Sequence, residues 1–209
     1  MQIDFKTSIS AEIAHIFVPV IIQSDESLAD RLNSFFDTDI HLAGIDQAGE
    51  QVREQKGNIA LAIPYHNGLL HFNLIPIDTD ENYRQIKDKT RKVFQKHKLS
   101  LEHSKNVLYL GQFNNGLSLE QCQAILHGFC LHDYEVGIYK TNLKPTNKNI
   151  KLDILCSTDQ AHSIQSVLNE ALELATTQKD IFKLVDAPSN KKSPAVLAQY
   201  AQKVAEAIS

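Results

Sequence analysis

The sequence predicts an α/β fold with a mixed sheet and helices on both faces. In the second half of the chain, Asn106 to Leu110 and Lys151 to Cys156 are β-rich runs that each precede an amphipathic stretch. Recurring strand–loop–helix units are typical of parallel strands joined by right-handed helical crossovers. In the first half, the Asn67-Gly68 pair between two β-rich runs is typical of a hairpin turn. Part of the sheet should therefore be antiparallel.

Four strands are predicted in the first half. Gln2 to Lys6 alternates polar and apolar residues and suits an edge strand, whereas His15 to Ile22 is nearly continuously apolar. A run of the second kind favours a strand buried on both faces. The other two strands are Asn58 to Pro64 and Leu69 to Ile77, joined by the hairpin turn Tyr65 to Gly68.

One helix is predicted between these strands, with Ser24 at its N-cap. Its apolar residues are Leu28, Leu32, Phe35 and Phe36. The following segment, Asp37 to Lys56, is polar and contains Gly44 and Gly49, and Gly57 follows it. We interpret it as a loop.

A strongly amphipathic helix is predicted after the hairpin, because Asp78 and Glu81 have the spacing of a capping box. One face of this helix carries Tyr83, Ile86, Thr90, Val93, Phe94 and His97. Basic residues lie outside that face: Lys87, Lys89, Arg91, Lys92, Lys96 and Lys98. We interpret them as a solvated helix face rather than as a phosphate-binding patch.

Two further helices begin with capping boxes, Ser118 with Gln121 and Ser157 with Gln160. The first is lined by Leu119, Cys122, Leu126, Phe129 and Cys130. The second is lined by Ala161, Ile164, Leu168, Ala171 and Ala175.

The C-terminal segment predicts two helical pieces around a hinge. The first carries Ile181, Leu184 and Val185 and ends at Ala187-Pro188, because a residue before proline disfavours the helical conformation. After the polar connection from Ser189 to Lys192, Ser193 suits an N-cap and Pro194 the first helical position. The apolar stripe of this last helix is Leu197, Tyr200, Ala201, Val204 and Ile208.

Composition sets the class of protein. The chain has 209 residues, a formal net charge of −4 and three cysteines. The negative charge argues against a broad nucleic-acid or anionic-membrane surface, and the odd cysteine count argues against a disulfide framework. Met1 to Ser8 has an acid where a signal peptide would be basic, and the apolar run Ile16 to Ile22 is too short to span a bilayer. We therefore expect a cytoplasmic protein.

Motifs for chemistry are sparse. Cys122, His127, Cys130 and His132 are close in sequence, but their spacing is not that of a structural zinc site, and both cysteines fall on an apolar helical stripe. We interpret them as core residues. The loop from Gly111 to Gly116 follows a strand and precedes a helix, where phosphates can bind, yet it matches neither the dinucleotide nor the P-loop pattern. A nucleotide or ADP-ribose site there is an alternative.

A resemblance to a known family rests on two stretches. Leu184 to Asn190, LVDAPSN, with Ser193-Pro194 after it, resembles the linker of the leucyl aminopeptidases, also called cytosol aminopeptidases. Gly128, Tyr134 and Tyr139-Lys140-Thr141 resemble that family's Gly-x-x-Leu-x-x-Tyr-x-Phe-x-x-Tyr-Lys-Thr segment. Val136 stands where the family prefers Phe, and Ser193 where it prefers Thr.

The resemblance implies a three-layer, macro-domain-like fold and a division of the chain. Residues 1–178 would form an N-terminal non-catalytic domain, and residues 179–209 a linker and helix leading to an absent catalytic domain. The parent enzyme would use two divalent metals, zinc or manganese, to hydrolyse N-terminal residues from peptides in a homohexamer. Its partners would be its own catalytic domain and sister subunits.

No catalytic, cofactor-binding or metal residue of that family can be carried over to a position in this chain. The chain alone is therefore expected to be inactive, with a role in assembly and substrate access. Two other interpretations stay open: a free-standing macro-like module that binds a nucleotide or ADP-ribose, and a DNA-binding accessory domain.

Overall fold

The computed structural model describes residues 2–9, 13–24, 27–36, 42–65, 68–111, 116–134 and 150–208. A six-stranded sheet with the strand order β1-β6-β5-β2-β4-β3 forms its centre. All neighbouring strands are parallel except β3 and β4, so the predicted mixed sheet is confirmed. The strands are β1 (Gln2–Lys6), β2 (Ile13–Ile21), β3 (Ile59–Tyr65), β4 (Gly68–Ile77), β5 (Lys105–Tyr109) and β6 (Lys151–Leu155).

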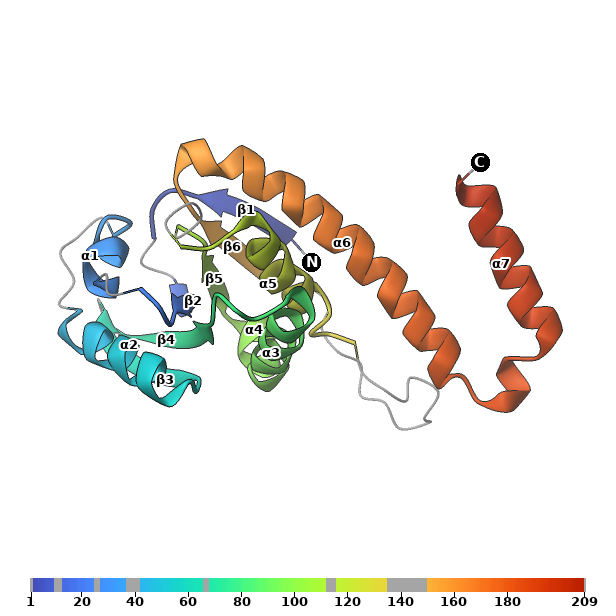
Figure 1. Ribbon diagram of the computed structural model, residues 1–209, viewed down its shortest axis with the longest axis horizontal. Helices are drawn as coiled ribbons and strands as arrows, with labels where there is room; N and C mark the ends of the chain where they lie inside the picture. Colours follow the sequence, from blue (N-terminus) through green and yellow to red (C-terminus); the bar gives the residue numbers. More distant parts are fainter. Residues whose placement is uncertain are drawn as a thin grey trace.

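Helices cover both faces of the sheet, which confirms the predicted three-layer α/β class (Figure 1). One face carries α1 (Leu28–Asn33) and α2 (Ala43–Gln55). The other face carries α3 (Tyr83–Lys96), α4 (Lys98–His103), α5 (Leu119–Cys130) and the first part of α6 (Thr158–Asp186). A short 3-10 helix, η1 (Ser189–Lys191), leads to α7 (Pro194–Ile208).

The alternation of side chains along each strand divides the core into two parts. In β4, Leu70, Phe72 and Leu74 belong to the core under α1 and α2. Ile75 and Ile77 belong to the core under α3, α5 and α6. Successive residues of this strand thus face opposite helix layers, as a pleated strand requires.

The two helix layers are offset across the sheet. Isoleucine and leucine side chains of β3 pack only in the core under α1 and α2, whereas Ile3 and Phe5 of β1 pack only in the opposite core. As a result, each edge strand has one face without a helix above it. On β3 this face carries the exposed Ala60 and Ala62, and on β1 it carries Asp4 and Lys6.

The helix predicted from Ser24 begins later in the structure. Ser27 is the N-cap of α1, and its hydroxyl oxygen accepts a hydrogen bond from the Asp30 N–H at 3.1 Å. The Asp46 carboxylate supports the same turn by accepting from the Leu28 N–H at 2.7 Å. The prediction of Ser24 as the N-cap was therefore wrong. The helix starts at Leu28, where Asp46 supports the first turn, and Asp46 belongs to a helix that the sequence did not predict.

That helix is α2, and it corrects the loop predicted over Asp37 to Lys56. Its apolar residues Ile45 and Val52 are fully buried. Burial against β2, β3 and β4 stabilises the helix in spite of Gly44 and Gly49, each of which costs about 1 kcal/mol relative to alanine. The helix ends at Lys56, which adopts a left-handed conformation with φ of 50°.

The start of α3 also differs from the prediction. Asn82 and Gln85 form the capping box, not Asp78 and Glu81. The Glu81 carboxylate instead accepts a hydrogen bond from the Asp78 N–H at 3.1 Å in the preceding turn. The predicted apolar face of α3 is confirmed by its buried residues, which are Ile86, Thr90, Val93 and Phe94.

The capping boxes of α5 and α6 are confirmed at Ser118 with Gln121 and at Ser157 with Gln160. Leu119 was expected to line the core but is exposed. The predicted separate helical piece around Ile181 is instead the end of α6, which runs unbroken for 29 residues across the expected boundary between residues 178 and 179. Within the described part of the chain, no helix combines the length and apolar character needed to cross a membrane.

Candidate junction between the α/β fold and the C-terminal helix

A group of polar and aromatic contacts holds the second half of α6 in place. The last fully buried residue of α6 is Ala175, so beyond it the helix is attached by side-chain contacts rather than by the sheet. Lys179 Nζ lies 2.6 Å from the Asp133 carboxylate at the end of α5. The centroid of the Phe182 ring lies 5.0 Å from that of the Tyr134 ring. The Arg91 guanidinium of α3 lies 5.6 Å from the centroid of the Phe182 ring. These contacts fix the direction in which α6 leaves the sheet.

Tyr134 and Asp186 join the two stretches that carry the family resemblance. The Tyr134 hydroxyl donates a hydrogen bond to the Asp186 carboxylate. The backbone carbonyl of Tyr134 also accepts from the Gln95 side-chain amide at 3.4 Å. The two stretches are separated in the sequence by more than 40 residues, and the structure brings one residue of each into contact. Val136 and Tyr139 to Thr141, the rest of the upstream stretch, lie outside the described residues.

Gly128, the first residue of the upstream stretch, permits α3 and α5 to approach closely. A Cβ atom at this position would lie 2.5 Å from the backbone carbonyl oxygen of Lys87 and nearer still to Thr90 Oγ1. Both obstructing atoms belong to α3. The glycine therefore allows the close packing of α3 against α5.

The hinge after α6 follows the prediction. Ala187 is buried and extended, with φ of −62° and ψ of 134°, and precedes Pro188. Lys192 Nζ caps the end of α6 by donating to the Val185 carbonyl at 3.0 Å. Ser193 then accepts a weak hydrogen bond from the Val196 N–H at 3.4 Å, where α7 begins.

Beyond the junction, apolar surface is left uncovered. Figure 1 shows that α7 stands apart from the α/β fold after the turn at η1. Exposed apolar residues gather on the outer side of α6 and on α7, and six of them are 40–65% exposed: Leu174, Ile181, Val185, Val196, Leu197 and Val204. Exposed apolar residues of this kind are typical of surfaces that other protein segments cover.

Between α5 and α6, this surface borders a groove of about 540 Å³ that is lined by His127, Glu170, Leu174 and Ile181, among others. His127 is buried, and its Nδ1 lies 2.9 Å from the Tyr83 hydroxyl. Burial, with a smaller contribution from Lys87, lowers the pKa of His127 to about 4. The imidazole is therefore neutral at physiological pH and acts as a hydrogen-bonding core residue.

The interpretation of the cysteines as core residues is confirmed. Cys122 and Cys130 are buried in the core under α3, α5 and α6. Burial raises the pKa of each thiol to about 12, which suppresses the thiolate that nucleophilic attack or metal binding needs. No group of three or more histidine, cysteine or acidic side chains arranged to hold a metal ion occurs within the described residues.

The hollow described at the carboxyl edge of the sheet offers poor conditions for a phosphate. A hollow of about 490 Å³ lies between the N-termini of α3 and α5, beside Gly116. Its lining includes Glu81 and Glu120, whose negative charges oppose an anion, and the N-cap side chains Asn82 and Ser118 already bond to their own helices. Residues 112–115 of the candidate Gly111 to Gly116 loop lie outside the described residues, so a nucleotide site there stays a prediction.

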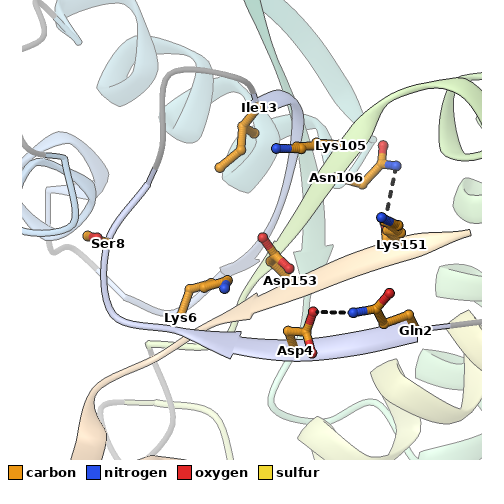
Figure 2. A pocket seen from close by; sticks show the side chains of 9 residues that line it. All are labelled: Gln2, Asp4, Lys6, Ser8, Ile13, Lys105, Asn106, Lys151 and Asp153. Carbon is orange, nitrogen blue, oxygen red and sulfur yellow. Dashed lines mark hydrogen bonds between the residues drawn. The ribbon is translucent and has the colours of Figure 1, made fainter.

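A second hollow, of about 330 Å³, lies on the helix-free face of β1 and its neighbours (Figure 2). Figure 2 shows the Asp153 carboxylate between the side chains of Lys6 and Lys105, with Asp4 and Gln2 further along β1. Burial raises the pKa of Asp153 although nearby lysines oppose the shift. Acidic and basic side chains alternate here, and they do not point toward one common position. We therefore interpret this hollow as ordinary charged surface rather than as a catalytic site.

The basic residues of α3 are largely engaged within the chain. Lys89 forms an ion pair with Glu81, and Lys87 lies 3.4 Å from Asp88. Arg91 lies over the Phe182 ring. These contacts engage Lys87, Lys89 and Arg91 within the chain and support the interpretation of α3 as a solvated face rather than a DNA-binding surface.

Comparison with known proteins places this fold among aminopeptidases. No protein-family model matches the sequence, and no curated protein sequence matches it. Among solved structures, a mutant of tomato leucine aminopeptidase matches with a TM-score of 0.66 and 17% identity, over 99% of this chain and 42% of that one. Cytosol aminopeptidase from Coxiella burnetii matches with a TM-score of 0.53 and 18% identity, over 97% and 37%.

A third similar structure, the bottromycin maturation enzyme BotP in complex with Mn, gives a TM-score of 0.56 and 13% identity, over 95% of this chain and 37% of that one. The chain thus spans about two-fifths of the length of these structures. The resemblance expected from the two short stretches is confirmed at the level of fold: nearly the whole chain has the fold of one part of a leucine or cytosol aminopeptidase.

Proposed function

We propose that this chain is the N-terminal, non-catalytic domain of an enzyme of the leucyl aminopeptidase type. Residues 1–178 would form a macro-like domain, and residues 179–209 would lead to a catalytic domain. The parent would be a cytoplasmic hydrolase that removes N-terminal residues from peptides, and this domain would serve its assembly into a homohexamer and limit substrate access.

One observation carries the proposal. Almost the entire chain, including α6, η1 and α7, is covered in the comparison with the tomato enzyme, while that enzyme has more than half of its length outside the match. If this chain is a separate, non-catalytic domain, it should match only one part of an aminopeptidase chain, as it does.

The junction gives this proposal a physical form. The contact between Tyr134 and Asp186 and the ion pair between Lys179 and Asp133 hold α6 on the α/β fold, and α7 projects beyond it. A catalytic domain attached after α7 would cover the exposed apolar residues of α6 and α7. The two divalent metals, zinc or manganese, would be held by that domain, as Mn is present in the structure of BotP.

Two measurements test the proposal. The purified 209-residue chain should not hydrolyse leucine-p-nitroanilide with added manganese or zinc, while a leucine aminopeptidase assayed in parallel does. Turnover by the pure chain would contradict the proposed non-catalytic role. In native extract, an antibody raised against this chain should detect a polypeptide much larger than 23.5 kDa, and a native product of that mass alone would refute the link to a catalytic domain.

A further inference from the structure

The edge strand β3 is exposed and uncharged. β3 ends the sheet, and no other strand among the described residues pairs with its outer side. Its sequence, IALAIPY, contains no charged residue, whereas β1 at the opposite edge carries Asp4 and Lys6. Proteins protect free edges with charges, bulges or covering segments, because an unpaired apolar edge strand invites another strand. β1 has such protection, whereas within the part of the chain that the structure describes no charge and no further strand protects the outer side of β3 along Ile59 to Ile63.

Pro64 indicates which backbone groups of β3 point outward. Proline has no N–H, so within a sheet it occupies positions whose N–H side faces away from the ladder. Backbone direction alternates along a strand, and Ala60 and Ala62 therefore share the outward direction of Pro64. Both alanines are exposed, and each can offer one N–H and one C=O to a further strand.

The residue order of β3 identifies the strand that fits. Ile59 to Ile63 reads isoleucine, alanine, leucine, alanine, isoleucine, and this order is the same in both directions. When such a strand pairs antiparallel with an identical strand centred on Leu61, each isoleucine meets an isoleucine, each alanine an alanine, and Leu61 meets its own copy. A two-fold interface uses the same patch of both copies, and this residue order makes that patch self-complementary.

Side-chain placement agrees with this register. Ile59, Leu61 and Ile63 are partly buried toward α2, and across the two-fold axis they would bury their remaining exposed surface against one another. On the opposite face only the small Ala60 and Ala62 lie at the contact. Large side chains therefore meet on one face and small ones on the other, so each cross-strand pair is matched in size.

We propose that β3 is an interface between two copies of this chain. The two strands pair antiparallel about a two-fold axis at Leu61, which extends the six-stranded sheet of each copy into one continuous sheet. In this register Ala60 of one copy lies opposite Ala62 of the other, and each of the two alanine pairs exchanges two backbone hydrogen bonds. This inference does not depend on the proposed aminopeptidase role, because it rests on β3 alone.

Sedimentation velocity over about a hundredfold range of concentration tests the interface. The chain should show a concentration-dependent species of twice the 23.5 kDa mass of one copy. The double variant A60K/A62K puts lysine opposite lysine in both alanine pairs and should weaken the association by about tenfold or more. The variant A60K/A62E puts lysine opposite glutamate at the same positions and should associate much more tightly than A60K/A62K.

The control variant A198K/A201K adds the same charge as A60K/A62K at exposed positions of α7 and should leave the association unchanged. A62P removes one outward N–H without adding charge and should also dissociate the pair, which provides a test if A60K/A62K fails to fold. A strictly monomeric chain would overturn the inference. So would association that A60K/A62K leaves intact, or equal loss in A60K/A62K and A60K/A62E. Because only mass is measured, these outcomes are independent of the activity assay.

Discussion

Replacement of Gly128 by alanine tests the close packing of α3 and α5 most directly. The added Cβ would lie 2.5 Å from the Lys87 carbonyl oxygen and closer to Thr90 Oγ1. Thr90 cannot turn away freely, because its hydroxyl is buried and bonded to the Ile86 carbonyl at 2.8 Å and the Lys87 carbonyl at 3.1 Å. The methyl group can therefore be accommodated only by moving the two helices apart.

The expected cost is the difference between two effects. Forcing a methyl group into a packed contact costs up to about 3 kcal/mol, and replacing a helical glycine by alanine recovers about 1 kcal/mol. Backbone atoms form part of the obstruction, so we take the upper value for the first effect. G128A should then lower the free energy of unfolding by about 2 kcal/mol and the melting temperature by roughly 4–8 °C.

Thermal and urea unfolding followed by circular dichroism measure this loss. Gly44→Ala is the matched control, because its Cβ would meet only Leu61 Cδ1 at an ordinary 3.9 Å. G44A should leave the stability unchanged or raise it by up to about 1 kcal/mol. If G128A were as stable as the wild type, the inference that this glycine sets the approach of the two helices would be wrong.

Three further predictions concern the same half of the molecule. Tyr134→Phe removes the hydrogen bond to Asp186 and should lower the free energy of unfolding by about 1–2 kcal/mol. Amide hydrogen exchange should become faster at the end of α6 and stay unchanged in β2. If exchange at the end of α6 equalled that of the wild type, this contact would not hold the helix. The folded-state pKa of His127 is lowered from 6.5 to about 4, so the unfolded chain binds its proton first, and the stability contributed by the neutral imidazole is lost as pH falls from about 6.5 to about 4. His127→Gln should flatten this decline in urea midpoints, and an unchanged pH profile would exclude His127 as its source. The native thiols should react with iodoacetamide far more slowly at pH 7 than after unfolding, because burial raises their pKa to about 11–12, and rapid native labelling would contradict the core assignment of Cys122, Cys130 and Cys156.

Features encoded within a few residues were predictable from the sequence. The capping boxes at Ser118 and Ser157 depend on a side chain and a backbone group three residues apart, and both form as expected. The end of α6 before Pro188 and the start of α7 after Ser193 depend on proline sterics and one hydroxyl group. These signals need no distant partner, but a local signal is not sufficient, because the caps predicted at Ser24 and at Asp78 did not form.

Only some residues of the candidate junction were identified from the sequence. Gly128, Tyr134 and the stretch from Leu184 to Asn190 were identified by resemblance, but nothing in their order shows that Tyr134 bonds to Asp186. The supporting contacts from Lys179 to Asp133 and from Arg91 to Phe182 were missed, because they join residues far apart in the chain. Of the four residues in these contacts, only Phe182 gave a signal in the sequence, because an aromatic side chain near the end of a helical pattern indicates a packing contact.

The amino-acid sequence was enough to predict the strands, the starts of α5, α6 and α7 and the hinge at Ala187-Pro188, since each follows from local patterning, sterics or a short-range hydrogen bond. Tertiary structure alone decided that residues 43–55 form a helix, because Ile45 and Val52 gain their stabilisation only when buried against the sheet. It also decided the offset of the two helix layers, which leaves Ala60 and Ala62 of β3 exposed. Burial of a side chain depends on which distant segment of the chain packs against it, whereas a helix cap depends on residues a few positions apart.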